Sequence, residues 1–250
     1  MDSLVSYDMT DGVATLVMDD GKVNVLSLGM LAAIHEALDK AVADRAAVVL
    51  AGRTGVFSAG FDLGTLRAGG PDGVAMGRGG FALAARVLSF PFPVVAACTG
   101  HAIAMGAFLL CACDYRIGAA GGFKFTANEV AIGYPVPEVA IAVLRNRLTP
   151  SALNRAVTLA EVSTPDNAVE NGYLDRVVAA EFVLGEAQEL ARTLTTLDLA
   201  AHATTKLTVR RSTLDVLEAA LASESALIDG QDRPRAADSD GEPAPAVRHG

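Results

Sequence analysis

Residues 93–114 read PVVAACTGHAIAMGAFLLCACD, and this stretch decides the fold. Val94–Cys98 is a short apolar run beside prolines, which predicts a strand buried on both faces. Ala104–Cys113 is apolar throughout apart from one glycine and predicts a buried helix. Polar and glycine residues at 99–101 and 106 interrupt the apolar run, so we do not expect it to span a membrane. A buried strand that leads into a buried helix is the unit of an α/β fold.

Toward the N-terminus, the pattern is that of a hairpin, a helix and a strand. Val5–Met9 and Val13–Met18 favour strands, and the Asp11-Gly12 pair between them is typical of a hairpin turn. Ala47–Ala51 is another short apolar run of the buried-strand type. A helix is expected before it, because four apolar residues fall at helical spacing on one face: Leu31, Ile34, Leu38 and Val42.

The middle of the chain continues this alternation. Glycines crowd the segment Gly69–Gly80, which predicts a flexible loop. A helix is expected from Phe81 to Leu88, ended by the prolines at 91 and 93. Further strands are expected at Asp114–Ile117 and Phe123–Thr126. Strands that alternate with helices predict an α/β fold with right-handed crossovers.

After about Pro150 the pattern becomes mainly helical. Ser163–Asp166 has a hydroxyl cap and a first-turn proline, so it predicts a helix start, and Gly172 predicts the end of that helix. Leu174–Val178 predicts one more strand, and two or three amphipathic helices follow from Glu181 to about Ile228. We therefore expect a catalytic core over 1–180, a helical region over 181–230 and a tail over 231–250, ordered only if something holds it.

Composition narrows the class of protein. The 250 residues carry a net charge of −9, which argues against a nucleic-acid surface, because no basic stripe offsets phosphate repulsion. The three cysteines (98, 111 and 113) and four scattered histidines show no zinc spacing, so buried thiols are expected and no metal. The sequence begins without a basic stretch followed by a long apolar one, so no signal peptide and a cytoplasmic location are expected.

Three segments have the character of a reaction site. Residues 56–63 (VFSAGFDL) contain small side chains that permit close backbone approach, and residues 99–106 (TGHAIAMG) lead into a helix whose first amides are unpaired. Residues 127–133 (ANEVAIG) hold one carboxylate, Glu129, in an apolar stretch. Taken singly, the glycines are also explained as turns and Glu129 as a surface charge. Neither G-x-G-x-x-G nor G-K-S/T is present, so nucleotide hydrolysis is not indicated.

In this order, the segments resemble the crotonase superfamily of enoyl-CoA hydratases and isomerases. The segment GKVNVL at 21–26 resembles the early Asn-Ala-Leu segment of that family, and FSAGFDL at 57–63 its Ala-Gly-x-Asp-Leu signature. Residues 97–114 resemble the segment that ends in Cys-Asp, and residues 164–178 the stretch that ends in Gly-x-x-Asp-x-Val-Val. The resemblance covers the chain to about residue 228. It implies a ββα spiral core with a C-terminal helical trimerisation region.

The resemblance also implies roles for particular residues. The backbone amides of Phe61 and Met105 are expected to hold the thioester oxygen, and Glu129 to act as acid and base. Lys206 lies where many members place a cation for a CoA phosphate; a solvated lysine on an amphipathic helix is the other explanation. The remaining residues expected to bind the CoA ester are Val23, Val25, Ala59, Gly60, Asp62, Leu63, Gly106 and Phe108. No cofactor is expected beyond the coenzyme A that the substrate carries.

One departure from the family pattern bears on the reaction. Hydratases of the family use two glutamates to hold and activate water, and the first of these falls on Phe108, which cannot transfer a proton. Members that keep only the second glutamate are typically Δ3,Δ2-enoyl-CoA isomerases, so the resemblance favours isomerisation with Glu129 as the sole acid/base.

Two alternatives stay open. A hydratase or related lyase would need a replacement acid, such as Glu138 or Asp62. An acyl-CoA-binding protein with little turnover would keep the groove without needing Glu129. By resemblance the partner molecules are an acyl-CoA thioester and further copies of the chain in a trimer or hexamer, with no nucleic acid and no membrane. Packing of the last helices on their own core is the alternative to the trimer.

Overall fold

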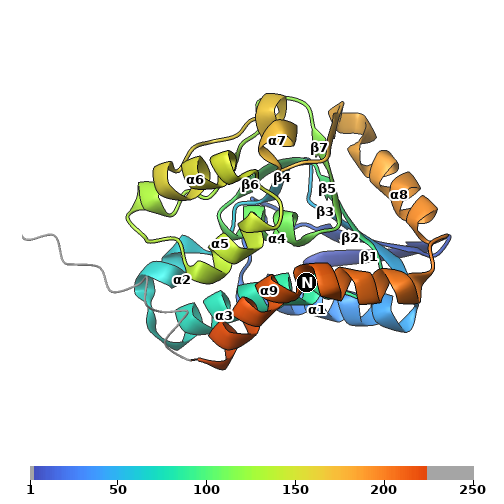
Figure 1. Cartoon of the computed structure of the whole chain (residues 1–250), viewed down its shortest axis with the longest axis horizontal. Coiled ribbons are helices and arrows are strands. Elements are labelled where there is room, and N and C mark those ends of the chain that lie inside the picture. Colours follow the sequence, from blue (N-terminus) through green and yellow to red (C-terminus); the bar gives the residue numbers. More distant parts are fainter. Residues whose placement is uncertain (1–2, 224–250) are drawn as a thin grey trace, which may run out of the picture.

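The computed structural model describes residues 3–223 and consists of two sheets with helices packed around them (Figure 1). The larger sheet has the strand order β1-β2-β3-β5-β7-β9 and the smaller one the order β4-β6-β8. The hairpin β1–β2 is antiparallel, and every other strand pair is parallel. The strands are β1 (Val5–Thr10), β2 (Val13–Met18), β3 (Ala47–Ala51), β4 (Gly55–Ser58), β5 (Val94–Cys98), β6 (Gly100–Ile103), β7 (Tyr115–Ala119), β8 (Phe125–Thr126) and β9 (Arg176–Val178).

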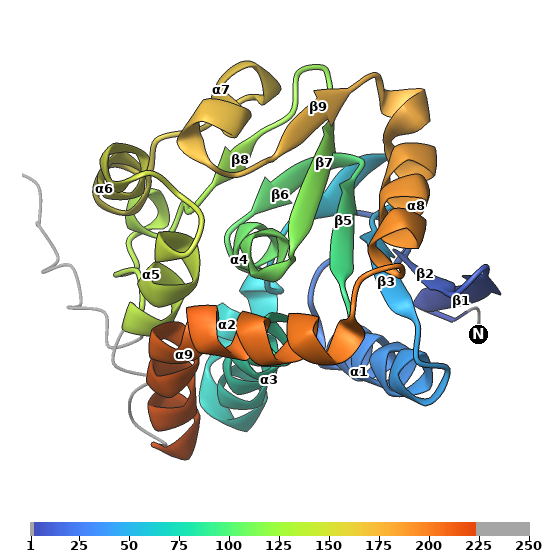
Figure 2. The same cartoon turned by 45° about the vertical axis from the view of Figure 1, so that its right-hand side comes forward.

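The central strands of the large sheet are buried on both faces. Along β3, Val48 and Leu50 point into the main core, whereas Val49 points to the opposite face. Helix α8 (Val183–Leu194) covers that second face, and the main core lies under α1 (Leu28–Ala43), α3 (Gly70–Leu88) and α4 (Met105–Ala112) (Figure 2). Burial of both faces explains why β3 and β5 are continuous apolar runs rather than alternating ones.

Helix α4 is the centre of the molecule, since all eight of its residues are buried. The long helix α9 (Leu199–Ala222) runs past it and packs on α3 and on α5 (Glu138–Arg145) of the same chain (Figure 2). The shorter elements are α2 (Leu63–Ala68), α6 (Pro150–Leu159), α7 (Pro165–Asn171) and the single 3₁₀ turns η1 (Val130–Ile132) and η2 (Ala180–Phe182).

Most sequence-based elements are confirmed, within one to three residues at each end. The hairpin, β3, β5, α4 and the helix start at Ser163–Asp166 are found as predicted, and Thr164 caps α7 in a capping box with Asn167. The strands β4 and β6 were not predicted. The prediction that Val42 lies on the buried face of α1 is wrong. Val42 is 41% exposed, because Ala41 occupies the buried position in the last turn. Ile228 and the tail over 231–250 lie outside the described residues.

The predicted loop over Gly69–Gly80 is wrong, because helix α3 begins at Gly70. Within the segment 69–80, only Gly69 and Gly70 have positive φ, and they lie at the junction of α2 and α3. Two of the later glycines allow close packing: a Cβ on Gly80 would lie 2.4 Å from the Phe61 ring, and one on Gly73 would lie 3.3 Å from Thr65 O. Packing of α3 against α1, α4 and α9 therefore overrides the weak helix propensity of glycine.

Other features of the described part bear on the class of protein. Cys98, Cys111 and Cys113 are free and fully buried, and burial raises the pKa of each thiol, as expected for inert core cysteines. Within residues 3–223, no helix has the length and apolarity that a membrane crossing requires.

Candidate active site

A cavity of about 130 Å³ opens at the N-terminal end of α4. It brings together all three segments that the sequence singled out, because Phe61, Ala104 and Glu129 all line it. Apart from Glu129, Asn128 and Tyr134, its walls are apolar or glycine. The full lining is Ala59, Phe61, Leu63, Leu66, Gly77, Phe81, Ala104, Phe108, Asn128, Glu129, Ile132, Tyr134, Pro135 and Pro137.

Close backbone contact positions the first wall of the cavity. Gly60 has a φ of +84°, and a Cβ there would lie 2.8 Å from Ile103 O and 3.2 Å from Met105 N. The segment at 23–26 pairs with the same stretch: the Ala59 amide donates to Val23 O at 3.0 Å, and the Leu26 amide donates to Gly60 O at 2.8 Å. Only glycine at position 60 allows these three segments to meet.

The start of α4 is held in an unusual conformation. Ala104, its N-cap, has φ 50° and ψ −125°, a region that side-chain-bearing residues rarely occupy. A Cβ on Gly106 would lie 2.4 Å from Ser58 O, so α4 begins directly against β4. Within residues 3–223, the amides of Phe61 and Met105 donate no hydrogen bond. Two neighbouring backbone segments therefore each offer one free donor, as an oxyanion site requires.

Three phenylalanines form the second wall. The ring of Phe81 lies edge-on to Phe61, with centroids 6.5 Å apart, and stacks on Phe108 at 6.4 Å. Phe108 is 2% exposed, so it is fixed in the core behind the cavity. The position where a second carboxylate would be expected is thus part of an aromatic cluster.

Glu129 is the acid/base candidate of this cavity. It lies between β8 and η1, and its backbone carbonyl accepts hydrogen bonds from the amides of Ile132 (3.0 Å) and Tyr134 (2.9 Å). Its side-chain Oε2 is buried and has no hydrogen-bond partner among residues 3–223. Burial raises the pKa of Glu129 to about 7, against an ordinary value of 4.5. A carboxyl group with this pKa can both accept and donate a proton near neutral pH.

Neither replacement acid lines the cavity. Asp62 caps α2, because its Oδ1 accepts a hydrogen bond from the Thr65 amide at 2.7 Å. Hydrogen bonding from Thr65 lowers the pKa of the Asp62 carboxyl group. Glu138 begins α5 and borders a different hollow together with Val216 and Ala219.

Other predicted residues have mixed positions. Ala59 and Leu63 line the cavity, and Val25 bridges to Gly60 next to it. Val23, 48% exposed, lies at the surface of the same segment.

Lys206 does not lie at this cavity. It is 6% exposed, and its ammonium donates to Asp114 Oδ2 at 2.7 Å in a second cavity. A buried and paired ammonium is not free to bind a CoA phosphate, and it is not the solvated lysine of the alternative explanation either. The face of α9 that carries Lys206 packs near the end of α4, where Lys206 and Arg210 both pair with the Asp114 carboxylate.

Several lining residues were not found from the sequence. Gly77 and Phe81 are four apart on α3, so they share one face, but the segment containing Gly77 was predicted as a loop. Tyr134, Pro135 and Pro137 follow η1 in a stretch without periodicity, so no sequence pattern indicated that they would face Glu129.

Known proteins resemble this chain in both sequence and fold. The sequence matches the family described as Enoyl-CoA hydratase/isomerase over residues 8–233. The fold is similar to an enoyl-CoA hydratase from Mycobacterium ulcerans, with 46% identity, a TM-score of 0.86 and 90% and 99% of the two chains covered. It is similar to a Mycobacterium tuberculosis protein that is called an enoyl-CoA isomerase in one structure and a probable enoyl-CoA hydratase in another. The first of these has 44% identity, a TM-score of 0.87 and 90% and 99% of the two chains covered. It is also similar to the human mitochondrial Δ3-Δ2-enoyl-CoA isomerase, with 27% identity, a TM-score of 0.86 and 92% of each chain covered.

Proposed function

Since this chain belongs to the enoyl-CoA hydratase/isomerase family, we propose that it moves the double bond of a 3-enoyl-CoA to the 2-position. The observation that carries the proposal is the single carboxylate of the cavity, Glu129, which faces an otherwise largely apolar lining. Addition of water needs two groups to hold and activate the water molecule, whereas a proton shift within the substrate needs one. Phe108 in the aromatic wall and the positions of Asp62 and Glu138 support the reaction that needs one group.

In the proposed mechanism, the amides of Phe61 and Met105 bind the thioester oxygen. Glu129, ionised, removes a proton from C2, and the electrons of that C–H bond move into a dienolate whose negative charge lies on the thioester oxygen. The protonated Glu129 then delivers the same proton to C4, the 2,3 double bond forms and the carbonyl is restored. Charge develops where the two amides point, and removal of one such donor typically costs ~10²–10³ in turnover.

The apolar wall has two roles in this mechanism. It holds the carbon chain, and it keeps water away from Glu129, so that the pKa of about 7 is maintained. The segments at 23–25 and 59–63 are proposed to hold the pantetheine part of the substrate next to the two amides, and Gly106 lets α4 approach β4 closely enough for that arrangement. Lys206 is not part of the proposed site.

A test uses the purified chain with a 3-enoyl-CoA and a 2-enoyl-CoA, followed by absorbance and mass. We expect conversion of the 3-enoyl substrate without change of mass, and loss of at least ~10²-fold in kcat in Glu129→Gln. Glu138→Gln is the matched control and is expected to keep full activity. A gain of one water on the 2-enoyl substrate would instead establish a hydratase, with Asn128 or Tyr134 as the first groups to test. Tight binding of CoA esters without turnover of either substrate would indicate a binding protein.

We further propose that the chain forms a homotrimer or a dimer of trimers. The support is that large apolar side chains stay exposed on the helices after residue 150, among them Leu159 (68%), Phe182 (59%) and Leu184 (36%). Light scattering coupled to gel filtration tests this, and a monomeric mass contradicts it.

A further inference from the structure

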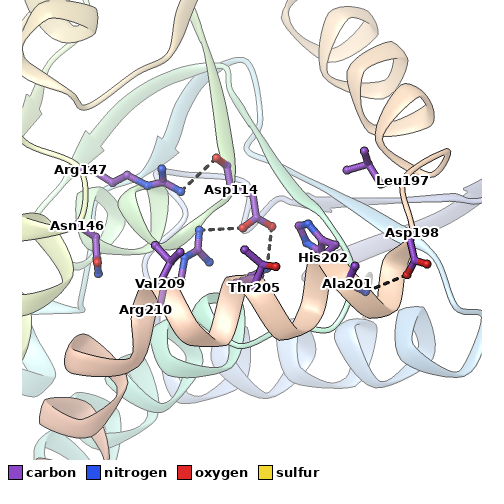
Figure 3. Close-up of a pocket in the computed structure, with 11 residues that line it drawn as sticks. Asp114, Asn146, Arg147, Leu197, Asp198, Ala201, His202, Thr205, Val209 and Arg210 are labelled. Carbon is purple, nitrogen blue, oxygen red and sulfur yellow. Dashed lines mark hydrogen bonds and ion pairs between the residues drawn. The ribbon is translucent and has the colours of Figure 1, made fainter.

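A second cavity, of about 490 Å³, lies at the opposite end of α4 (Figure 3). It is bordered by the first half of α9, by Asn146 and Arg147 after α5, and by Asp114, two residues beyond the end of α4. It shares no lining residue with the cavity of Glu129. The proposed reaction therefore does not use it.

Three cationic side chains form the floor of this cavity, and only one buried carboxylate faces them. Lys206 Nζ lies 2.7 Å from Asp114 Oδ2, and Arg210 Nη2 lies 2.8 Å from Asp114 Oδ1. Lys206 and Arg210 are each 6% exposed. Both oxygens of Asp114 are thus occupied by two buried cations.

Arg147, the third cation, forms no ion pair with a carboxylate of residues 3–223. Its Nη2 donates to the backbone oxygens of Cys113 (2.7 Å) and Asp114 (3.1 Å). Its Nε is buried and has no partner among residues 3–223. Carbonyl oxygens carry only partial charge, so they hold the guanidinium in place without neutralising it.

The other polar groups around the cavity do not supply the missing charge. Asp198 lies exposed at the rim, where it caps α9 by accepting a hydrogen bond from the Ala201 amide at 2.9 Å. His202 Nε2 is buried without a partner in the described part of the chain. Arg116, next to the cavity, is already paired with Asp175. In a chain of net charge −9, this cavity holds a local excess of positive charge.

The pKa values agree with that excess. Burial is the main cause that lowers the pKa of Lys206 to about 8. The Asp114 carboxylate opposes this change, and the positive charge of Arg210 adds to it. Burial, Arg116 and Arg210 lower the pKa of Arg147, and the opposing effect of Asp175 does not offset them. The charge of Arg210 is therefore unfavourable to the charges of both Lys206 and Arg147.

We propose that this second cavity binds an oxyanion, the carboxylate or phosphate group of a small molecule, with Arg147 as its principal ligand. The guanidinium fork suits such groups, and buried cations bind them more strongly than exposed ones. Thr205 and Val209 border the mouth and are exposed, Val209 at 72%, so a solute reaches the floor from solvent (Figure 3). The proposal does not depend on the reaction at Glu129.

The test is calorimetric titration of the full chain with inorganic phosphate and, separately, with acetate, at an ionic strength held constant with NaCl. We expect saturable binding of at least one of them, and the comparison of the two distinguishes a phosphate from a carboxylate ligand. Arg147→Gln is expected to raise Kd at least tenfold. Arg155→Gln, which removes a part-buried arginine outside the cavity, is the matched control and leaves Kd unchanged.

A second pair of variants protects the test against misfolding of Arg147→Gln. Val209→Glu places a carboxylate at the mouth from an exposed position, so it preserves the fold and raises Kd at least tenfold. Val209→Gln has the same size without the charge and leaves Kd within about twofold. No saturable binding of either anion, or equal Kd values in Val209→Glu and Val209→Gln, overturns the proposal.

Discussion

At the scale of single residues, the burial of Glu129 affects both the proposed proton transfer and the stability of the fold. The pKa of about 7 means that half of the molecules carry the ionised base at neutral pH. We expect kcat/KM for 3-enoyl-CoA to rise about tenfold per pH unit below that value and to level off above it. Initial rates between pH 5 and pH 9 measure this. A half-maximal rate near pH 4.5 would contradict the burial argument.

The same burial costs stability above neutral pH. The pKa of Glu129 is higher in the folded chain than in the unfolded one, so the folded chain binds more protons between about pH 4.5 and pH 7. Stability therefore falls as pH rises through that window. Glu129→Gln removes the cost, and we expect it to raise the free energy of unfolding at pH 8 by up to about 3 kcal/mol. Urea unfolding at pH 8 and pH 4 measures this, and the gain should vanish at pH 4. Glu138→Gln, the exposed control, should change stability by less than about 0.5 kcal/mol at either pH.

Ala104 lines the cavity of Glu129 and has a strained backbone conformation. Its φ of 50° and ψ of −125° suit glycine, and such strain costs about 1–3 kcal/mol. We expect Ala104→Gly to stabilise the chain by about 1 kcal/mol, because relief of strain exceeds the entropy that glycine loses on folding. Ala107→Gly, in the same helix but in ordinary conformation, should destabilise it instead by about 1 kcal/mol. Thermal unfolding compares the two, and the same sign for both would refute the strain.

At the scale of elements, we expect α3 to determine which acyl chains fit the cavity. Gly77 lines the cavity, and a Cβ at that position has no atom within 4 Å. We expect Gly77→Leu to fill this space, so that kcat/KM falls at least tenfold for a long 3-enoyl-CoA and changes less than threefold for a short one. Gly185→Leu in α8, an equally unobstructed helical glycine away from the cavity, is the control and should leave the chain-length profile unchanged. An unchanged profile in Gly77→Leu would refute the role of α3.

Some helices and strands could be predicted from the sequence, and others could not. Apolar runs such as Ala47–Ala51 and Val94–Cys98 predicted their strands to the residue, because burial on both faces leaves few other patterns. The motifs brought Phe61, Phe108 and Glu129 to one cavity. Helix α3 could not be predicted, since Gly73, Gly79 and Gly80 allow close packing with α2, α1 and α4 that no local pattern records. The role of Lys206 was taken from the family resemblance, which does not record that the Asp114 carboxylate pairs with this ammonium in the interior.

At the scale of the whole molecule, Asp114 joins parts of the chain that are far apart in sequence. It accepts a hydrogen bond from the Val94 amide at 2.7 Å and pairs with both Lys206 and Arg210, so β5, the end of α4 and α9 meet at one carboxylate. We expect Asp114→Ala to cost about 3–5 kcal/mol, because two cations are left buried without a partner. Asp198→Ala, which removes only the cap of α9, should cost about 1 kcal/mol. Denaturant unfolding measures both, and equal losses would contradict the central role of Asp114.

Because the backbone is closely packed at Gly60 and Gly106, substitutions are tolerated less well there than in the wall of the cavity. The proposed oxyanion site is made of backbone, and its geometry depends on positions where even a methyl group would collide with the main chain. The acyl wall is made of side chains on α3 and after η1, where Gly77 has open space and Pro135 is exposed. Descendants of this chain can therefore acquire new substrates by point mutation of the wall while they inherit the chemistry unaltered. A mutant library aimed at new acyl groups should vary the wall and keep residues 58–61 and 104–106 fixed.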